Sequence, residues 1–162
     1  MTRHAHVGTD LGLTDQEKKQ LHCIARSVIE SKTSGTPTPA FEASTPTLKE
    51  KRGAFVSLHS KGQLRGCIGY IHAVKPLYQT IQEMALAAAF QDPRFPPLGR
   101  DELANLDIEI SVLTPMREII DISEIEVGTH GLMIVMGNYS GLLLPQVATE
   151  YGWNRTEFLE KT

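Results

Sequence analysis

Two strand-like runs, residues 52–59 and 63–71, constrain the fold of this chain more than any other feature. They are joined through Ser60, Lys61 and Gly62, and the glycine permits the positive φ that tight hairpin turns need. The pattern predicts an antiparallel hairpin. It therefore commits the chain to at least one β-sheet.

Helices are predicted on both sides of this hairpin. Thr14 to Glu17 has the form of a capping box, and apolar residues then recur every three or four positions to about Lys32. A second apolar helical face begins at Pro76 and ends before Asp92. Further elements are a strand at 108–113, a hairpin of 132–136 with 141–144, and short helices at 145–150 and after Asn154. This mixture lacks strict βαβ alternation, so the sequence predicts an α+β fold.

Two loops and one terminus have no helical or strand period. Ser, Thr, Pro and Gly dominate residues 33–47, and three prolines stiffen residues 92–98. Residues 1–13 carry no period and are expected to be flexible. At 162 residues in total, the rest of the chain is predicted to be a single domain, 14–162.

Composition argues against several functional classes. The net charge is −3 with no run of basic residues, so nucleic acid is not predicted as a partner. Cys23 and Cys67 are far apart and no spacing resembles a zinc site, so neither a metal nor another cofactor is predicted. The sequence begins without an apolar leader and has no window long enough to span a bilayer. We therefore expect a cytoplasmic protein that does not enter a membrane.

Cys67 lies in the second strand of the hairpin, between Gly66 and Gly69 and two residues after Arg65. Alternation along a strand puts Arg65, Cys67 and Gly69 on one face. The arginine would then lower the pKa of the thiol or hold an anion such as carboxylate or phosphate. The plain alternatives are a buried, inert cysteine and an arginine that forms a salt bridge with a nearby carboxylate.

The register of the hairpin decides between these interpretations. One register places Val56 opposite Cys67, facing an apolar side of the sheet, while a shift of one residue brings Ser57 and Phe55 opposite instead. Gly66 and Gly69 weaken a regular strand, and such glycines often mark a bulge or a close approach of a ligand or backbone. The sequence leaves both registers open.

A thiol nucleophile usually needs a base, and His59, His72 and His130 are the available histidines near predicted strands. Each of them also fits an ordinary surface position. Asp92 and Arg94 flank Pro93 in the stiff loop, where they would either bind a ligand or staple the loop. The staple is the simpler interpretation.

Several of these segments together resemble the AMMECR domain family, whose members are also called AmmeMemoRadiSam system protein A. The resemblance covers most of the chain from about residue 50 onward. It rests on the matching segments Lys51 to Val56, Leu64 to Gly69, Asp92 to Leu98, Ile108 to Pro115, His130 to Leu132 and Leu142 to Trp153.

The resemblance implies a mixed, largely antiparallel sheet flanked by helices, with a cleft to which the 64–69 strand and the 92–98 loop contribute. The family's motifs point to Arg65, Gly66, Cys67, Gly69, Asp92, Arg94 and His130 as site residues. Family members occur beside a Memo-type protein and a radical S-adenosylmethionine enzyme, which are therefore the implied partners. The family pattern normally continues past Leu159 with a further segment, and its absence would favour a homodimer.

Two hypotheses about function follow. In the first, Cys67 is a thiol nucleophile in a cleft, Arg65 binds an anionic group, and His130 is a weaker catalytic candidate, with Gly66, Gly69, Asp92 and Arg94 as ligand-binding residues. In the second, the chain is a non-catalytic module that binds a Memo-type protein and a radical S-adenosylmethionine enzyme. The sequence does not decide whether the protein is an enzyme.

Overall fold

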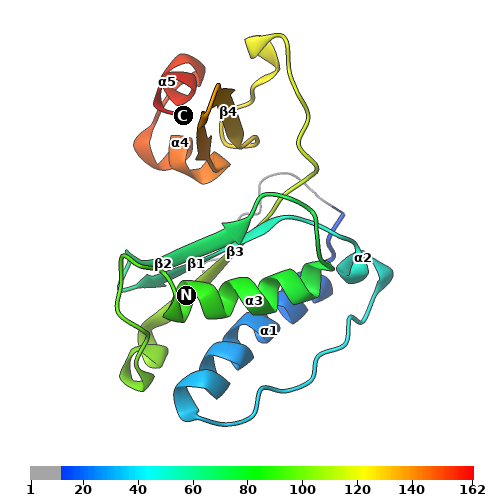
Figure 1. Cartoon of the computed structure of the whole chain (residues 1–162), viewed down its shortest axis with the longest axis vertical. Helices are drawn as coiled ribbons and strands as arrows, with labels where there is room; N and C mark the ends of the chain where they lie inside the picture. Colours follow the sequence, from blue (N-terminus) through cyan, green and yellow to red (C-terminus); the bar gives the residue numbers. More distant parts are fainter. Residues whose placement is uncertain (1–11) are drawn as a thin grey trace. The chain divides into compact units, whose positions relative to one another are not determined.

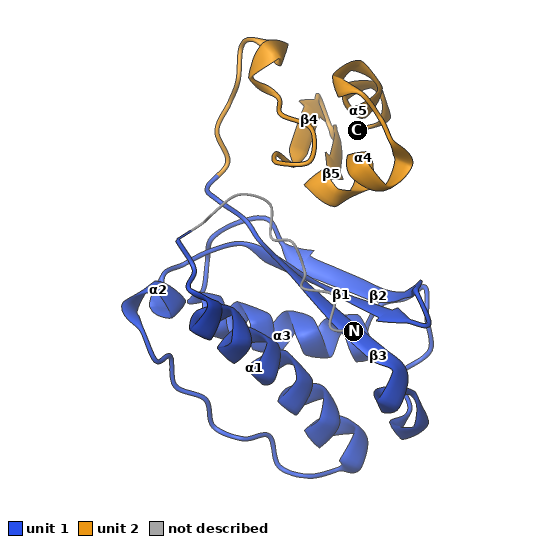
Figure 2. Ribbon diagram, turned by 180° about the vertical axis from the view of Figure 1, so that it is seen from behind, with its two compact units in different colours: residues 1–7, 11–115 blue, residues 8–10, 116–162 orange. Residues whose placement is uncertain are grey.

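A computed structural model describes residues 12–162 of the chain. The flexibility expected of residues 1–11 lies outside this range, while Leu13 is described and is buried. The described residues form two compact units, one running to Pro115 and the other spanning Met116–Thr162 (Figure 2). The single domain expected over 14–162 stays a prediction.

The first unit combines helices with a three-stranded sheet (Figure 1). In chain order its elements are α1 (Asp15–Ser34), α2 (Pro46–Lys49), β1 (Ala54–Ser60), β2 (Gln63–Tyr70), α3 (Leu77–Phe90), the 3-10 helix η1 (Arg100–Asn105) and β3 (Leu106–Val112).

Helix α1 begins and ends where the sequence predicts. The Thr14 hydroxyl accepts a hydrogen bond from the Glu17 N–H, and the Glu17 carboxylate accepts one from the Thr14 N–H, which completes the capping box. Gly35 ends the helix in the left-handed conformation with a φ of 68°. The periodic apolar residues between these caps form one buried stripe, which includes Leu21, Ile24 and Val28.

The sheet of the first unit has the order β2-β1-β3, and both strand pairs are antiparallel. Figures 1 and 2 show α1 and α3 packed against the same face of this sheet. That face carries the fully buried residues Ala54, Val56 and Leu58 of the central strand. We call the opposite side the outer face, and its residues at the middle of the sheet are Phe55, Ser57, Cys67, Gly69 and Glu109.

A tight turn and a bulge together set the register between β1 and β2. Lys61 and Gly62 form the turn with positive φ values of 52° and 79°, and Ser60 pairs with Gln63. Regular pairing from that turn would place Val56 opposite Cys67. A β-bulge between Leu58 and His59 adds one residue on β2, so Ser57 is the residue that lies opposite Cys67.

The bulge also brings Gly66 to the helix-covered face of the sheet. A Cβ at this position would overlap the backbone carbonyl oxygen of Ala88 in α3. Ala85 and Ala88 are small and almost fully buried, so the α3 backbone approaches β2 closely along this contact. The glycine is therefore required by helix-to-strand packing, one of the two roles that the sequence suggested for it.

The second unit contains η2 (Ile122–Glu124), the hairpin of β4 (Leu132–Met136) and β5 (Tyr139–Leu143), α4 (Pro145–Tyr151) and α5 (Arg155–Lys161). The two strands are antiparallel. Helix α5 begins with a capping box between Asn154 and Glu157. A separate core is formed by the buried residues Ile125, Leu132, Ala148 and Phe158.

The α+β fold class is confirmed, and every strand pair described in residues 12–162 is antiparallel. The principal predicted helices and strands are present within one to three residues of their expected limits. Three short elements, α2, η1 and η2, are additions, because segments of three to six residues carry no readable helical period. In the described part of the chain, no helix has the length and apolar character needed to cross a bilayer.

Candidate functional site

Cys67 lies on the outer face of the sheet, in a row that also contains Ser57 and Glu109. Ser57 on β1 is the Cα partner of Cys67 on β2 and of Glu109 on β3. The Ser57 hydroxyl donates a hydrogen bond to the Cys67 sulfur at 3.1 Å. Cys67 is partly exposed, whereas Ser57 is buried. The register set by the bulge thus gives the thiol polar neighbours instead of the apolar contact with Val56.

The surroundings of Cys67 act on the pKa of its thiol in opposite directions. Burial is the largest influence and raises the pKa of Cys67 above the ordinary value for cysteine. The Ser57 hydrogen bond and the positive charge of Arg94 lower that pKa, while the negative charges of Asp92 and Glu109 raise it. Because the increase prevails, the thiol form is favoured at neutral pH.

Asp92 and Arg94 staple the loop that follows α3 to the backbone of Cys67. The buried Asp92 carboxylate accepts hydrogen bonds from the Cys67 N–H at 2.9 Å and the Arg94 N–H at 3.1 Å. It is also paired with the Arg94 guanidinium, whose Nε and Nη2 lie 3.0 and 2.7 Å from its oxygens. Arg94 Nη2 further donates to the Cys67 carbonyl at 3.4 Å. We call this arrangement the Asp92–Arg94 clasp; it has the contacts expected of a staple, while ligand binding by these two residues stays a prediction.

The clasp has clear electrostatic consequences. Hydrogen bonds from the Arg94 guanidinium, with help from the Cys67 N–H, hold the pKa of Asp92 well below its usual range. The same pairing raises the pKa of Arg94. Asp92 is therefore a fixed negative charge at neutral pH and is unsuited to act as a general acid or base.

Arg65 forms a second attachment for the same loop. Its Nε and Nη2 lie 2.7 and 3.1 Å from the two Glu102 carboxylate oxygens, and Nη2 also donates to the Pro96 carbonyl at 2.9 Å. The salt bridge that was one of the plain alternatives for Arg65 is therefore present, while its binding of an anionic ligand stays a prediction. The pairing lowers the pKa of Glu102. The arginine whose charge acts on the Cys67 thiol is Arg94, while Arg65 is committed to Glu102.

Both of these arginines contact the ring of Phe95. The guanidinium carbons of Arg65 and Arg94 are 5.7 and 5.5 Å from its centroid, within the range of cation–π contacts. The Leu98 N–H also donates to the Ala89 carbonyl at 2.9 Å, which closes the loop against the end of α3. Loop 92–98 is thus held at both ends and in the middle, with the Arg94 side chain 54% exposed.

The histidines take separate positions. His130 belongs to the second unit, is exposed, and uses Nδ1 to accept a hydrogen bond from the Glu126 N–H. His59 is on β1 opposite Asp107 of β3, and His72 is exposed after β2. His130 therefore shapes a turn of its own unit, and its catalytic role stays a prediction.

The geometry adds Ser57, Glu102 and Glu109 to the residues expected from the sequence. Ser57 and Glu109 follow from alternation once the register is known. Glu102 carried no signal, because its partner Arg65 is 37 residues away in the sequence. Within residues 12–162, no group of three or more His, Cys, Asp or Glu side chains comes together in a way suited to a metal ion.

Comparison with known proteins gives a family match and several similar sequences. The AMMECR1 family model matches residues 22–162. A protein of Methanothermobacter thermautotrophicus is 45% identical over 158 residues, which cover 93% of this chain and 82% of the relative. Protein NEQ441 of Nanoarchaeum equitans is 43% identical and covers 84% of this chain and 79% of its own length.

A solved structure shares the fold as well. The crystal structure of uncharacterized protein PH0010 from Pyrococcus horikoshii superimposes with a TM-score of 0.84 at 38% sequence identity. The match covers 93% of this chain and 79% of that one. The family model alone spans most of the chain, from within α1 to its last residue. The chain therefore belongs to the AMMECR1 family.

Proposed function

We propose that this chain is a protein-binding module whose recognition surface is loop 92–98. The observation that carries the proposal is the attachment of this loop at two places, through the Asp92–Arg94 clasp and through the hydrogen bond from Arg65 to the Pro96 carbonyl. A loop already fixed before binding loses little conformational freedom when a partner docks. Its binding energy is therefore available for affinity.

The side chains that this loop presents are suited to recognition. Arg94 is more than half exposed, and the partly exposed Phe95 ring lies within cation–π distance of its guanidinium. Arginine and aromatic residues contribute most often to the energetic centres of protein interfaces. Pro96 and Pro97 beside them are exposed and restrict the backbone further.

The Memo-type protein and the radical S-adenosylmethionine enzyme suggested by the family resemblance are the partners to test. Each would be purified, and its affinity for the full chain measured by titration calorimetry. Arg94→Glu reverses a charge on the proposed surface. It should weaken binding by tenfold or more, which is about the effect of replacing a hot-spot residue in an interface. Cys67→Ser should leave the affinity unchanged.

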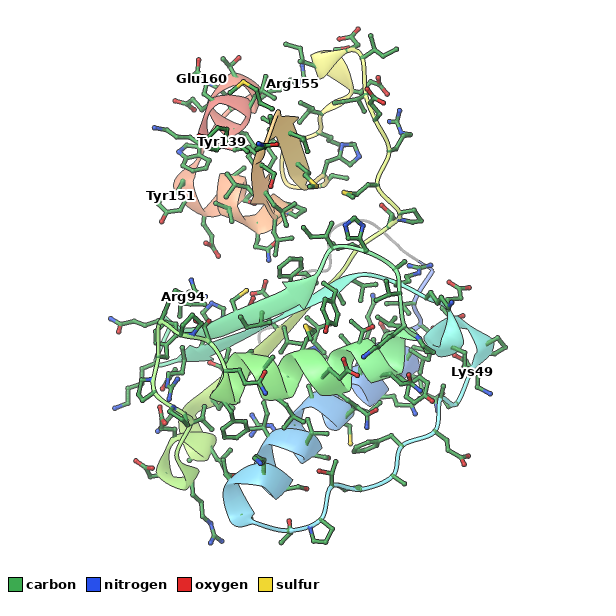
Figure 3. The ribbon with its side chains drawn as sticks, in the orientation of Figure 1. Lys49, Arg94, Tyr139, Tyr151, Arg155 and Glu160 are labelled. Carbon is green, nitrogen blue, oxygen red and sulfur yellow. The ribbon has the colours of Figure 1, made fainter. Side chains whose placement is uncertain are left out.

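A matched charge reversal at Lys49→Glu provides the control. Lys49 is exposed in α2, and Figure 3 shows it and Arg94 toward opposite ends of α3. Circular dichroism would establish that each variant is folded before its affinity is compared. Equal losses from Arg94→Glu and Lys49→Glu, or full affinity in both, would contradict loop 92–98 as the recognition surface.

A second candidate function is thiol chemistry at Cys67. What supports it is the hydrogen bond from the Ser57 hydroxyl and the positive charge of Arg94, which both favour the thiolate. Burial of the sulfur acts in the opposite direction and prevails. The rate of alkylation of Cys67 against pH tests this candidate: a midpoint well below about 8.5, the pKa of a free cysteine, would favour it over simple binding.

A further inference from the structure

The backbone of Cys67 occupies the open side of an edge strand. Among the strands described in residues 12–162, which form a sheet of order β2-β1-β3, β2 is paired only with β1. The Cys67 N–H donates to Asp92 and the Cys67 C=O accepts from Arg94. Both backbone groups therefore point away from β1. Antiparallel alternation turns the backbone groups of Gly69, two residues further on, toward the same side.

We propose that the Asp92–Arg94 clasp stands in for one residue of a fourth strand and thereby prevents β2 from pairing with β2 of a second copy of this chain. A residue on a neighbouring strand would accept from the Cys67 N–H and donate to its C=O. The Asp92 carboxylate does the first and the Arg94 guanidinium does the second. The clasp thus satisfies both groups without offering a new edge.

Other features of β2 also hinder the pairing of a further strand with its open edge. The bulge opposite Leu58 and His59 interrupts the regular ladder at Arg65, two residues before the clasp. A partner strand would have to run roughly 5 Å from β2, in the space where loop 92–98 contacts Cys67. Bulges, charged side chains and covering loops are the devices by which proteins protect sheet edges from association.

A second copy is the occupant favoured by the strand itself. β2 carries no charged residue between Cys67 and Tyr70, and in an antiparallel pair of β2 strands the same segment would face itself. Such an isologous pairing closes on two copies through one shared strand edge. This inference does not depend on the proposed binding function of loop 92–98.

The test compares the full chain with the double variant Asp92→Ala/Arg94→Ala. Hydrogen exchange measured on dilute protein should show the Cys67 amide exchanging about tenfold faster or more, because a hydrogen bond to a charged acceptor has been removed. Sedimentation velocity should show the variant associating as its concentration rises, while the unmodified chain stays monomeric. Protection at Gly69 should increase in the associated form.

Arg117→Ala/Glu124→Ala is the matched control, because it removes an exposed ion pair from the second unit and should not cause association. Asp92→Asn keeps an acceptor for the Cys67 N–H but loses the charge that pairs with Arg94. It should associate less than the double alanine variant and more than the unmodified chain, and the second comparison still tests the proposal if the double variant does not fold. Faster exchange at Cys67 without association would overturn the proposal. So would association in which Gly69 remains unprotected, or Asp92→Asn associating as strongly as the double variant.

Discussion

The Asp92 Oδ2 atom accepts a hydrogen bond of 2.9 Å from the backbone N–H of Cys67, which lies 25 residues earlier in the chain. This contact joins the loop after α3 to the middle of β2. It is formed by a carboxylate that is only 4% exposed and is otherwise neutralised by Arg94. The environment of Cys67 and the shape of the loop are therefore linked through one side chain.

Replacing that side chain should destabilise the protein. Asp92→Ala leaves the Cys67 N–H and the Arg94 guanidinium without their shared acceptor, and we expect a loss of about 2–4 kcal/mol. Urea unfolding followed by circular dichroism measures the change. Asp101→Ala, which removes an exposed carboxylate from η1, is the control and should change stability by less than about 0.5 kcal/mol. Equal losses from the two variants would contradict a stabilising role for the clasp.

The same carboxylate should give stability a characteristic dependence on pH. Hydrogen bonds from Arg94 lower the folded-state pKa of Asp92, so its contribution is present above the unfolded value of about 4 and is lost as the pH falls toward the folded value. The stability difference between the unmodified chain and Asp92→Asn should be constant near neutral pH and shrink in acid.

Glu17 and Glu102 also have lowered pKa values, through hydrogen bonds from Thr45 and Arg65 respectively. They titrate in both proteins, so their effects cancel in the difference between the unmodified chain and Asp92→Asn. Urea unfolding at a series of pH values provides the data. A difference that grows in acid would show that the ionised form of Asp92 is the destabilising one, contrary to expectation.

Close packing of α3 on β2 gives a third prediction. A Cβ at Gly66 would overlap the Ala88 carbonyl oxygen, which belongs to the α3 backbone and cannot rotate away. Gly66→Ala should therefore cost about 1–3 kcal/mol in unfolding free energy, as overpacked cores do. Gln63→Ala on the exposed end of the same strand is the control. If Gly66→Ala is as stable as the control, the helix and strand must be further apart than described.

Local patterns in the sequence were sufficient for most of the fold. Caps at Thr14 and Asn154, the Lys61-Gly62 turn and the prolines of loop 92–98 each act within a few residues, so the elements that they delimit could be predicted. The Asp92–Arg94 staple is also local, since its two side chains are two residues apart.

The environment of Cys67 could not be predicted in the same way. The tight turn alone favours Val56 opposite the cysteine, and the bulge that replaces Val56 by Ser57 was suggested only by two glycines. A bulge depends on tertiary packing, here the contact of Gly66 with α3. The pairing of Arg65 with Glu102 is likewise nonlocal. Nothing in the sequence pointed to Glu102, so Arg65 could be interpreted as a neighbour that acts on the Cys67 thiol.

The last prediction concerns the thiol itself. In a Cys23→Ser background, which removes the exposed second cysteine, alkylation of Cys67 should reach half its maximal rate above about pH 8.5, because burial raises the pKa of Cys67. Ser57→Ala removes a hydrogen bond that lowers this pKa and should move the midpoint higher. Glu109→Gln removes a negative charge that raises it and should move the midpoint lower. The two variants should shift the midpoint in opposite directions, so a general change in access to the sulfur cannot explain both shifts. Midpoints that move together, or a midpoint below that of a free cysteine in the parent, would show that the row of Cys67, Ser57 and Glu109 does not set the reactivity of the thiol.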